Sequence, residues 1–457
     1  MKTVALFFAL GLSMLGAAPA AAAPPVNVPI GANQSVWFVE DHKLPMLALS
    51  VSLPAGSAYD PPAKPGLSAF AAYLLNEGAG KLNANAYQDE LARRAIELSM
   101  TPGRDYLTVS LVTLSSNVND AFRLLALALA KPRFDGDAIA RVRAQMLQSL
   151  VQEGEDPQAL AARSFYAMFF AGHPYGHEIN GTPSGLSAIT AADLRAFTRT
   201  HWVRGGIKIA VAGDIDRVTL IALLKATFEP LPAMTPPPPP RLSRPAAPSM
   251  RVVPMAVPQS VAIFGLPGML RQDPDYLAGY VANHIVGGGD FSSRLTDEVR
   301  EKRGLTYGVS TSFGDYRAAG YIIGQVATKR ESMNESLAVI RDTLRKFALD
   351  GPTEQELADA KTYLTGSYPL AFSSNAGIAS QLNAFQRSGL PIDYVTRRNG
   401  LINALTLDDV RRAAQRLFDP SRLTVVVAGT VGGGGSQMFA PKLPTTHHGR
   451  PPRRPPP

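Results

Sequence analysis

The feature that most constrains the fold of this chain is an internal repeat. The segment AITAADL at residues 188–194 matches ALTLDDV at 404–410, and IAVAGD at 209–214 matches VVVAGT at 425–430. Both matches lie 216 residues apart in a chain of 457 residues, with no gap between them. A constant separation across two motifs indicates a duplicated structural unit. We therefore expect two homologous domains.

Each copy of the repeat is typical of a helix that leads into a buried strand. Thr190 and Thr406 are suitable N-cap residues, and acidic residues follow in the first helical turn. The apolar, β-branched strand behind each helix ends in Gly213 or Gly429. Elsewhere, strands are expected at 46–53, 106–114, 260–266 and 319–327. Helices are expected at 67–75, 138–150, 160–170, 276–286, 333–349 and 353–368. Because strands and helices do not alternate regularly, the pattern predicts an α+β fold of mostly antiparallel sheets covered by helices.

A proline-rich stretch lies between the two copies. Residues 231–250 include five consecutive prolines at 236–240, which favour an extended polyproline II spacer. This linker, expected to be exposed, separates an N-terminal domain at 27–230 from a C-terminal domain at 251–430, each close to a typical domain size. The Gly-, Pro- and Arg-rich end at 431–457 is predicted to be a disordered tail.

Residues 1–22 have the pattern of a signal peptide. Lys2 supplies a positive charge, an apolar run of 12 residues follows at 4–15, and small residues at 18–22 offer cleavage sites. The run is shorter than the roughly 20 residues needed to span a bilayer, although an uncleaved membrane anchor is the alternative. Because the chain has no cysteine, a lipoprotein anchor is excluded. We expect an exported, periplasmic protein with no stable membrane anchor.

The net charge of +8 at pH 7 at first suggests a nucleic-acid partner. Seven of these charges lie in the leader, the linker and the tail, which contain no Asp or Glu: Lys2, Arg241, Arg244, Lys442, Arg450, Arg453 and Arg454. The rest of the chain is therefore close to neutral, and no nucleic-acid partner is expected. The absence of cysteine also excludes disulfides, thiolate metal sites and a cysteine nucleophile.

Three stretches carry a resemblance to a known family. They read PAGSAYDPPAKPGLSAFAAYLLNEGAG at 54–80, HPYGHEINGT at 173–182 and FSSRLTDEVREKRGLTYGV at 291–309. With the VAGD strand ending, they resemble the pitrilysin/insulinase family of zinc metallopeptidases, in particular its processing-peptidase-like branch. The resemblance covers about residues 30–430, and its most specific element is REKRGLTY at 300–307. It implies that the two domains form half of a two-chain clamshell.

In catalytic members of that family, the helix after the Pro-Gly-Leu turn carries the inverted zinc motif H-x-x-E-H. The two histidines bind zinc from one helix face, and the glutamate is the general base for the attacking water. The resemblance places these positions at Ala69, Ala72 and Tyr73, whose side chains cannot replace imidazole and carboxylate. We therefore expect neither a metal nor another cofactor in this chain.

The family's distal zinc ligand is a glutamate in a later helix. The matching place falls near Gln148 or Ser149, and Glu153 and Glu155 lie too far along the helix. No glutamate is therefore expected opposite the motif helix.

The histidines of the chain offer no substitute metal site. His173 and His177 are spaced i, i+4, but Pro174 and Gly176 lie between them and favour a structural turn over a shared helix face. The isolated histidines are expected to be packed or exposed residues: His42, His201 and His284.

The resemblance also implies a second part of the active site, in the C-terminal domain. In the family, an arginine and a tyrosine seven residues apart face the zinc, bind the substrate backbone and stabilise the oxyanion. Arg300 and Tyr307 match this spacing. Guanidinium and phenol are suitable donors, because their hydrogen bonds strengthen as negative charge develops on oxygen. The alternative is that Arg300 belongs to a solvated charged helix and Tyr307 to a core.

Two functional hypotheses follow. The first is a non-catalytic, substrate-binding subunit of an exported heterodimeric zinc metallopeptidase, inactive alone. It would supply Arg300 and Tyr307 to the zinc site of a homologous partner that carries H-x-x-E-H, for the hydrolysis of peptides. The second is a non-proteolytic peptide-binding or scaffold protein. Hydrolysis by a serine mechanism has no support, since the chain has no G-x-S-x-G or S-x-x-K motif.

Overall fold

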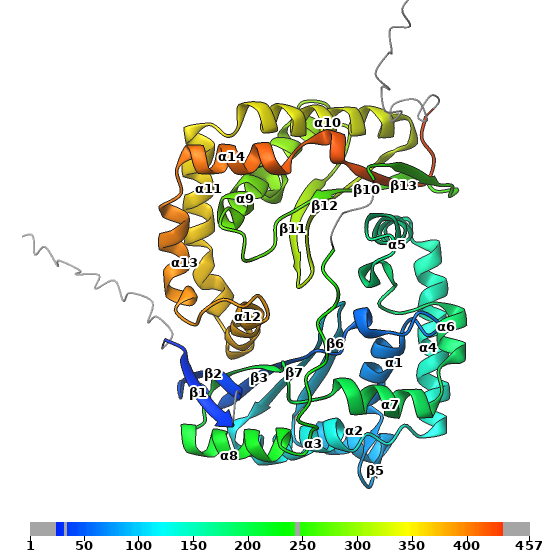
Figure 1. Ribbon diagram of the computed structural model, residues 1–457, viewed down its shortest axis with the longest axis vertical. Coiled ribbons are helices and arrows are strands. Elements are labelled where there is room, and N and C mark those ends of the chain that lie inside the picture. Colours follow the sequence, from blue (N-terminus) through cyan, green and yellow to red (C-terminus); the bar gives the residue numbers. More distant parts are fainter. Residues whose placement is uncertain (1–23, 32–33, 243–246, 433–457) are drawn as a thin grey trace, which may run out of the picture.

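The computed structural model describes residues 24–31, 34–242 and 247–432, which form two halves stacked on each other (Figure 1). The predicted signal peptide at 1–22 and residues 433–457 of the predicted tail lie outside these ranges. Within them, no helix has the length and apolar character that a membrane span requires.

Each half is built on one sheet. The strands of the N-terminal sheet are β1 (Val26–Gly31), β2 (Gln34–Glu40), β3 (Met46–Leu53), β6 (Glu97–Pro102), β7 (Leu107–Leu114) and β8 (Lys208–Gly213). Those of the C-terminal sheet are β9 (Met250–Val253), β10 (Gln259–Pro267), β11 (Val309–Tyr316), β12 (Ala319–Lys329) and β13 (Thr424–Ala428). A separate small hairpin joins β4 (Gly78–Ala79) and β5 (Leu82–Asn83).

The two sheets have the same topology. The N-terminal order is β1-β2-β8-β3-β7-β6, and the C-terminal order read from the other edge is β9-β13-β10-β12-β11. In each sheet one neighbouring pair is parallel, β2 with β8 and β9 with β13, and all other pairs are antiparallel. The second sheet thus repeats the first strand for strand, with β1 as an addition. The predicted duplication and the predicted mostly antiparallel sheets are confirmed.

Helices surround both sheets. They are α1 (Leu67–Tyr73), α2 (Ala84–Arg93), α3 (Val118–Ala130), α4 (Gly136–Glu155), α5 (Pro157–Phe169), α6 (Pro183–Ala188), α7 (Ala191–His201), α8 (Arg217–Phe228), α9 (Tyr276–Asn283), α10 (Met333–Asp350), α11 (Glu354–Gly366), α12 (Asn375–Arg387), α13 (Tyr394–Asn403) and α14 (Leu407–Leu417). In the repeated pair α7 and α14, Thr190 and Thr406 cap the helices through reciprocal bonds with Asp193 and Asp409. The predicted α+β class is confirmed, since each predicted helix and strand corresponds to one of these elements.

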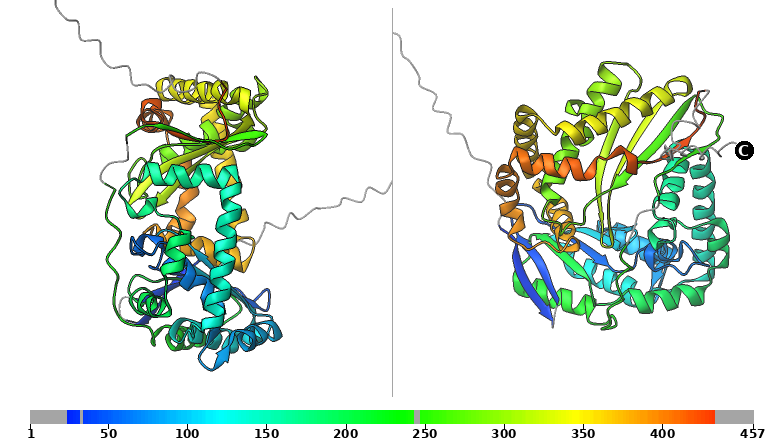
Figure 2. Two further views of the ribbon diagram at one scale, coloured as in Figure 1. Left: turned by 90° about the vertical axis from the view of Figure 1, so that its right-hand side faces the viewer. Right: turned by 45° about the horizontal axis from the view of Figure 1, so that its top comes forward.

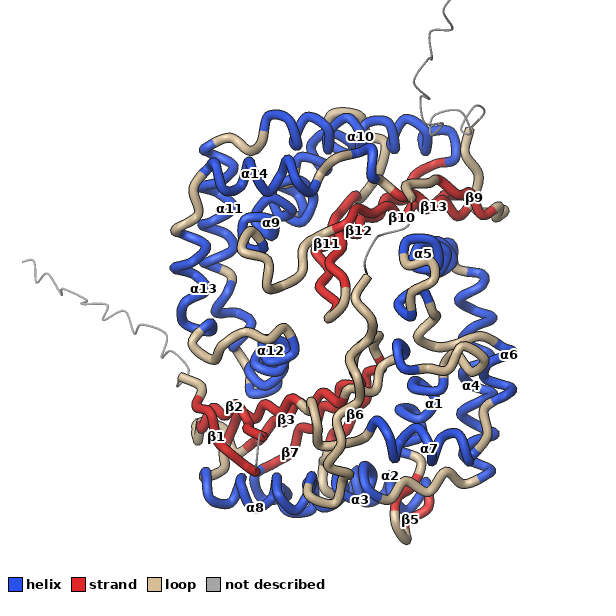
Figure 3. Tube along the Cα trace, in the orientation of Figure 1, coloured by secondary structure: helices blue, strands red, loops and turns tan. Residues whose placement is uncertain are grey.

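The two halves exchange helices. α12, from the C-terminal half, covers the face of the N-terminal sheet that looks toward the other half, and α5, from the N-terminal half, covers the facing side of the C-terminal sheet (Figure 3). α4 rises along one side to α5, and α11 and α13 descend the other side to α12 (Figure 1). Each sheet is therefore covered on its outer face by its own helices and on its inner face by a helix of the other repeat.

Polar contacts fix the exchanged helix α12 on its sheet. The buried Asn383 donates to the carbonyl oxygens of Ser50 at 3.1 Å and Lys208 at 2.9 Å, and accepts from the hydroxyl of Ser52 at 2.6 Å. Buried polar groups are costly unless paired, so these bonds specify where the helix binds.

Two hairpin tips meet where the halves join. The tip between β6 and β7 carries Asp105, whose carboxylate accepts from the Tyr175 hydroxyl at 2.5 Å and from the Arg317 amide at 2.9 Å. The tip between β11 and β12 carries Arg317 and Ala318, and the Ala318 amide donates to the Tyr175 hydroxyl at 3.1 Å. The corresponding hairpins of the two repeats thus share one buried polar network.

The linker lies along one side of the molecule, where it connects the two halves (Figure 2). Pro236 and Pro239 are buried, a spacing of three that matches the three residues per turn of polyproline II. His173 holds the end of the proline run through its Nε2, which lies 2.6 Å from the Pro240 carbonyl oxygen. The linker is extended as predicted, but the expectation that it is exposed is wrong for these two prolines.

Glycine is required where the equivalent strands β8 and β13 end. Gly213 has a φ of 132° and Gly429 a φ of 126°. A Cβ at Gly213 would overlap the Met46 carbonyl oxygen, and one at Gly429 would overlap the Ser260 side chain. Both strands therefore end in a conformation that other residues rarely adopt.

Candidate functional site

The helix that carries the inverted-motif positions is α1. Gly66 precedes it with a φ of 95°, and Asp60 fixes this entry by accepting from the amides of Gly66 and Ser68, both at 2.8 Å. Asp60 is only 5% exposed, and this burial raises its pKa to about 7. The start of α1 is thus held rigidly by a buried carboxyl group.

The side chains at the three motif positions do not fit a metal. Ala69 and Ala72 are fully buried in the N-terminal core, and Tyr73 is 37% exposed. Two methyl groups and a phenol replace the imidazoles and the carboxylate that zinc chemistry requires. In the described ranges, no group of three or more His, Cys, Asp or Glu residues could hold a metal ion. No reaction step through zinc can be assigned to this chain alone.

Glu153 lies opposite the motif helix, which corrects the prediction that it is too far along α4. The Tyr73 hydroxyl donates to Asn180 Oδ1 at 3.2 Å, and Asn180 Nδ2 donates to Glu153 Oε1 at 3.0 Å. Burial and the nearby Glu153 raise the pKa of Tyr73. The predicted places, Gln148 and Ser149, are instead exposed, because they lie on another face of α4.

A second acidic residue, Glu178, joins this cluster and was not recognised in the sequence. Burial raises its pKa, while Arg104 and Arg163 oppose that shift. Its Oε1 atom is buried and has no hydrogen-bond partner. The only sequence signal was its place in the stretch HPYGHEINGT at 173–182. Tyr73, Asn180, Glu153 and Glu178 therefore form a polar cluster that contains no imidazole.

His173 and His177 flank a single 3-10 turn, Pro174–Gly176, as the structural interpretation predicts. His173 is buried, and its Nδ1 accepts from the Tyr175 amide at 3.1 Å. Both of its ring nitrogens are therefore used within the fold. Burial lowers the pKa of His177, whose Nδ1 has no partner.

The isolated histidines are packed or exposed, as expected. His42 is exposed, and bonds to Asp214 and Glu40 raise its pKa. His201 stacks on Phe197 at 4.4 Å, His284 stacks on Tyr363 at 5.1 Å, and burial lowers the pKa of both histidines.

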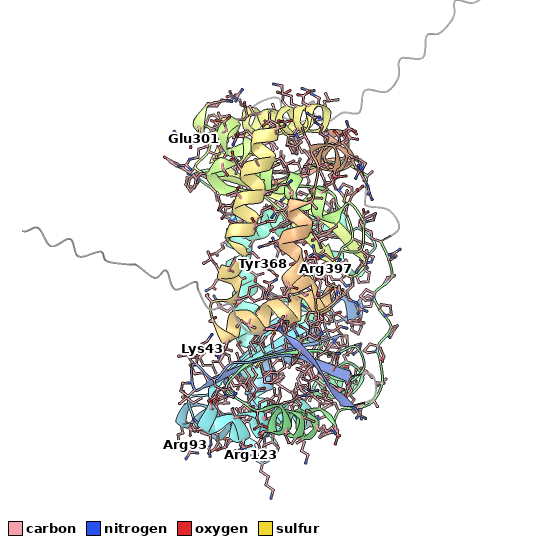
Figure 4. All side chains as sticks on the ribbon, turned by 90° about the vertical axis from the view of Figure 1, so that its left-hand side faces the viewer. Lys43, Arg93, Arg123, Glu301, Tyr368 and Arg397 are labelled. Carbon is pink, nitrogen blue, oxygen red and sulfur yellow. The ribbon has the colours of Figure 1, made fainter. Side chains whose placement is uncertain are left out.

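Arg300 lies at the end of the π-helical turn Thr296–Glu301. Its guanidinium lies over the Phe291 ring, 4.7 Å from the centroid, and pairs with Glu301 at 3.4 Å. The neighbouring Lys302 and Arg303 form closer ion pairs, both with Glu298 at 2.6 Å. Arg300 is therefore the most loosely paired of these three cations. Its neighbour Glu301 is labelled in Figure 4, at the edge of the C-terminal half.

Tyr307 is 88% exposed and makes no hydrogen bond or ring contact with another described residue. Its neighbour Thr306 fixes the loop, because the Thr306 hydroxyl donates to the Ala327 carbonyl at 2.7 Å and accepts from the Gly308 amide at 3.0 Å. The alternative that Tyr307 belongs to a core is therefore wrong. Arg300 and Tyr307 lie on one exposed segment with free donors, but they are not in contact with the Tyr73 cluster.

The fold and the site together define a metallopeptidase-like protein whose metal positions carry other side chains. Residues 36–183 match the family model "Insulinase (Peptidase family M16)", and residues 188–364 match "Peptidase M16 inactive domain". The chain belongs to the peptidase M16 family, which confirms the resemblance to pitrilysin and insulinase.

Individual relatives agree with this assignment. The chain is 27% identical to the "Non-peptidase homolog YmxG" of Helicobacter pylori over 382 residues, 83% of this chain and 88% of the relative. A solved peptidase M16 inactive domain from Pseudomonas fluorescens has a TM-score of 0.84 and 31% identity, covering 89% of this chain and 98% of that structure. The crystal structure of a protease from Helicobacter pylori shares the fold with a TM-score of 0.81 at 17% identity, covering 88% and 99%. With the residues at the motif positions, these findings support a non-catalytic member of the family.

Proposed function

We propose that this chain is the non-catalytic, substrate-binding subunit of an exported heterodimeric zinc metallopeptidase. Its partner would be a homologous subunit that carries H-x-x-E-H and the zinc ion. This chain would supply Arg300 and Tyr307 to the partner's active site, and it would be inactive alone.

One observation carries this proposal: the positions of the metal ligands carry other residues, whereas the arginine and the tyrosine are present and accessible. Ala69 and Ala72 are buried methyl groups, so the motif helix has become part of the core. Tyr307 instead stands in solvent on a loop that Thr306 holds in place. A large aromatic side chain with an unused hydroxyl on a fixed loop suits contact with another molecule.

The chemistry of the pair suits amide hydrolysis in a neighbouring site. A phenol and a guanidinium each donate a hydrogen bond to the carbonyl oxygen of a bound peptide, and these bonds strengthen as that oxygen becomes negative. The Phe291 ring restricts the guanidinium of Arg300, which reduces the entropy lost when it binds a substrate. The partner's zinc would activate the water.

Export to the periplasm is part of the proposal. It is supported by the positive, apolar and small-residue pattern of residues 1–22. Peptides are the proposed substrates, because the retained donors suit peptide backbone.

A non-proteolytic peptide-binding scaffold is the second candidate. It is favoured by the relative from Helicobacter pylori, whose name describes a non-peptidase homologue. In that case the exposed Tyr307 would contact a bound peptide or protein without any hydrolysis.

Reconstitution separates the two candidates. The mature chain is co-purified with a homologous subunit that carries H-x-x-E-H and is encoded nearby, and the mass of the complex is measured by light scattering. The peptidase proposal requires a stable complex with zinc in the partner and peptide cleavage that neither chain shows alone. If the partner cleaves peptides equally well without this chain, the peptidase proposal is refuted and the scaffold function remains.

A further inference from the structure

A polar cavity lies where the two hairpin tips meet the end of α12. Its volume is about 480 Å³, and its walls include Gly103–Tyr106, Gly314–Arg317, Ala384 and Arg387–Gly389. We name it the junction pocket. This size is in the range of small-ligand sites. It is built from both halves, so it exists only in the complete fold.

The junction pocket has an excess of positive charge. Four arginines line it, Arg104, Arg271, Arg317 and Arg387, and two carboxyl groups, Asp105 and Asp315. Asp105 is engaged by the Tyr175 hydroxyl and the Arg317 amide. The Asp315 carboxylate has the Ser388 hydroxyl at 3.5 Å. Burial raises the pKa of both acids, and Arg387 opposes this shift in each. Four guanidinium groups against two carboxyl groups leave the pocket with a net positive charge.

Two of the four arginines are fixed by aromatic neighbours. Arg104 is buried, donates to the Tyr175 carbonyl at 2.8 Å and lies over the Tyr166 ring at 3.8 Å. Arg271 donates to the Tyr394 hydroxyl at 2.7 Å and lies over the Tyr276 ring at 4.2 Å. They therefore form the fixed positive wall of the junction pocket.

The other two arginines are less constrained. The Arg317 guanidinium donates to the Tyr59 hydroxyl at 3.4 Å, lies 5.6 Å from the centroid of the Tyr106 ring and attracts the Asp105 carboxylate. Arg387, at the end of α12, is exposed; it attracts Asp105 and Asp315 but forms no hydrogen bond or ion pair with another residue in the described part of the chain. Two guanidinium groups with unused donors at one cavity are suited to a carboxylate, which they can bind in a bidentate manner.

A second cavity adjoins the first and is aromatic. It also has a volume of about 480 Å³, and it shares Arg271, Asp315, Ala384 and Ser388 with the junction pocket. Its walls carry six aromatic residues, Tyr276, Tyr280, Tyr363, Tyr368, Phe385 and Tyr394. Tyr368 marks its place between the two halves in Figure 4. We name it the aromatic pocket.

We propose that the two pockets form one binding site for a peptide segment in which a carboxylate lies next to an aromatic or large apolar side chain. The carboxylate binds Arg387 and Arg317 in the junction pocket, and the apolar side chain enters the aromatic pocket past Arg271. This inference rests on the proposed function, because it specifies which peptides the chain selects. The carboxylate belongs either to an Asp or Glu side chain or to the C-terminus of the peptide.

Fluorescence anisotropy with the isolated mature chain tests this site. Three labelled peptides of equal length contain one Phe: one with a neighbouring Glu and an amidated end, one with Gln and a free C-terminus, and one with Gln and an amidated end. We expect the neutral peptide to bind at least about tenfold more weakly than one of the acidic peptides. The acidic peptide that binds more tightly identifies the source of the carboxylate.

Variants show whether the junction pocket is responsible. Arg387→Gln should weaken the acidic peptide about tenfold and leave the neutral peptide unchanged. The matched control is Arg397→Gln, which removes another exposed positive charge, on α13 (Figure 4). Arg397 is paired with Asp393 at 3.0 Å. This control should bind like the unmodified chain, and both variants should keep its melting temperature, since neither arginine is buried.

Three outcomes overturn the inference: no binding, equal binding of acidic and neutral peptides, or equal losses in the two variants. The assay needs no partner subunit, so its failure is distinguishable from failure of the proposed function. If a reconstituted pair cleaves peptides but the isolated chain binds none, only the binding site is refuted. If the isolated chain binds as expected but Tyr307 has no role in cleavage, only the proposed function is refuted.

Discussion

Replacing Tyr307 by Phe removes one hydroxyl group from a side chain that is 88% exposed. That hydroxyl has no partner among the described residues, and the loop is fixed by Thr306 rather than by the tyrosine. The free energy of unfolding should therefore change by less than about 0.5 kcal/mol. If the hydroxyl stabilises an oxyanion over the partner's zinc, turnover should fall on the order of 10²–10³-fold, which corresponds to about 3–4 kcal/mol of transition-state stabilisation.

The assay is steady-state cleavage of a peptide by the reconstituted pair, with the mass of the complex and its zinc content recorded for each variant. Val218→Ala is the control, because Val218 is also exposed, at 78%, and lies on α8 in the N-terminal half, outside both pockets. Arg300→Ala should lower both turnover and peptide affinity, since it removes a charged donor that acts before and during the reaction.

Full cleavage activity of Tyr307→Phe in an intact, zinc-loaded complex would refute the reasoning. A loss of activity together with a loss of complex mass would also refute it, because Tyr307 would then be an assembly residue. A loss that Val218→Ala reproduces would show that the effect does not depend on position.

Three further predictions concern the chain alone. The purified chain should bind no stoichiometric zinc, because Ala69 and Tyr73 provide no imidazole; equimolar tight zinc in elemental analysis would contradict this. In the folded state the pKa of Asp60 is about 7, above its ordinary 3.8. Between these two values the folded state keeps a proton that the unfolded state releases. The free energy of unfolding should therefore fall between about pH 4 and pH 7, by up to about 1.4 kcal/mol per pH unit. Asp60→Asn should flatten this slope in urea denaturation, and an unchanged slope would assign it to other groups. Asn383→Ala should lower the free energy of unfolding by about 3 kcal/mol, because it leaves the carbonyl groups of Ser50 and Lys208 without their donor. If the urea midpoint changes no more than it does for substitution of an exposed residue, these bonds contribute little to stability.

The sequence predicted the repeated elements well because their signals are local. The capping threonines Thr190 and Thr406 and the terminal glycines Gly213 and Gly429 can be recognised without knowledge of the rest of the fold. The spacing of 216 residues then extends to whole sheets of equal topology.

The exchange of α5 and α12 could not be predicted in the same way. An amphipathic pattern shows that a helix buries one face, but not which sheet receives it. Asn383 pairs with Ser50 and Lys208, more than 170 residues away in both cases, and no local pattern relates these residues.

The site was predicted in part. Ala69, Ala72 and Tyr73 lie on the helix that the resemblance implies, and Arg300 and Tyr307 lie on an accessible segment. Glu153 lies about one helical turn beyond the place expected near Gln148 or Ser149, because spacing in the sequence does not fix the rotation of a helix of 20 residues. Asn180, which connects Glu153 to Tyr73, lies in a turn that no periodic pattern describes.

The exchange of helices has a consequence for how the chain matures. Until residues 375–387 have emerged from the ribosome, the inner face of the first sheet, which includes Trp37, Val39 and Ala48, has no cover. The first half is therefore an apolar, aggregation-prone intermediate throughout most of synthesis, and holding chaperones should recognise it. Once both helices are seated, hydrolysis of a single peptide bond in the linker cannot separate the halves, because each still holds a helix of the other.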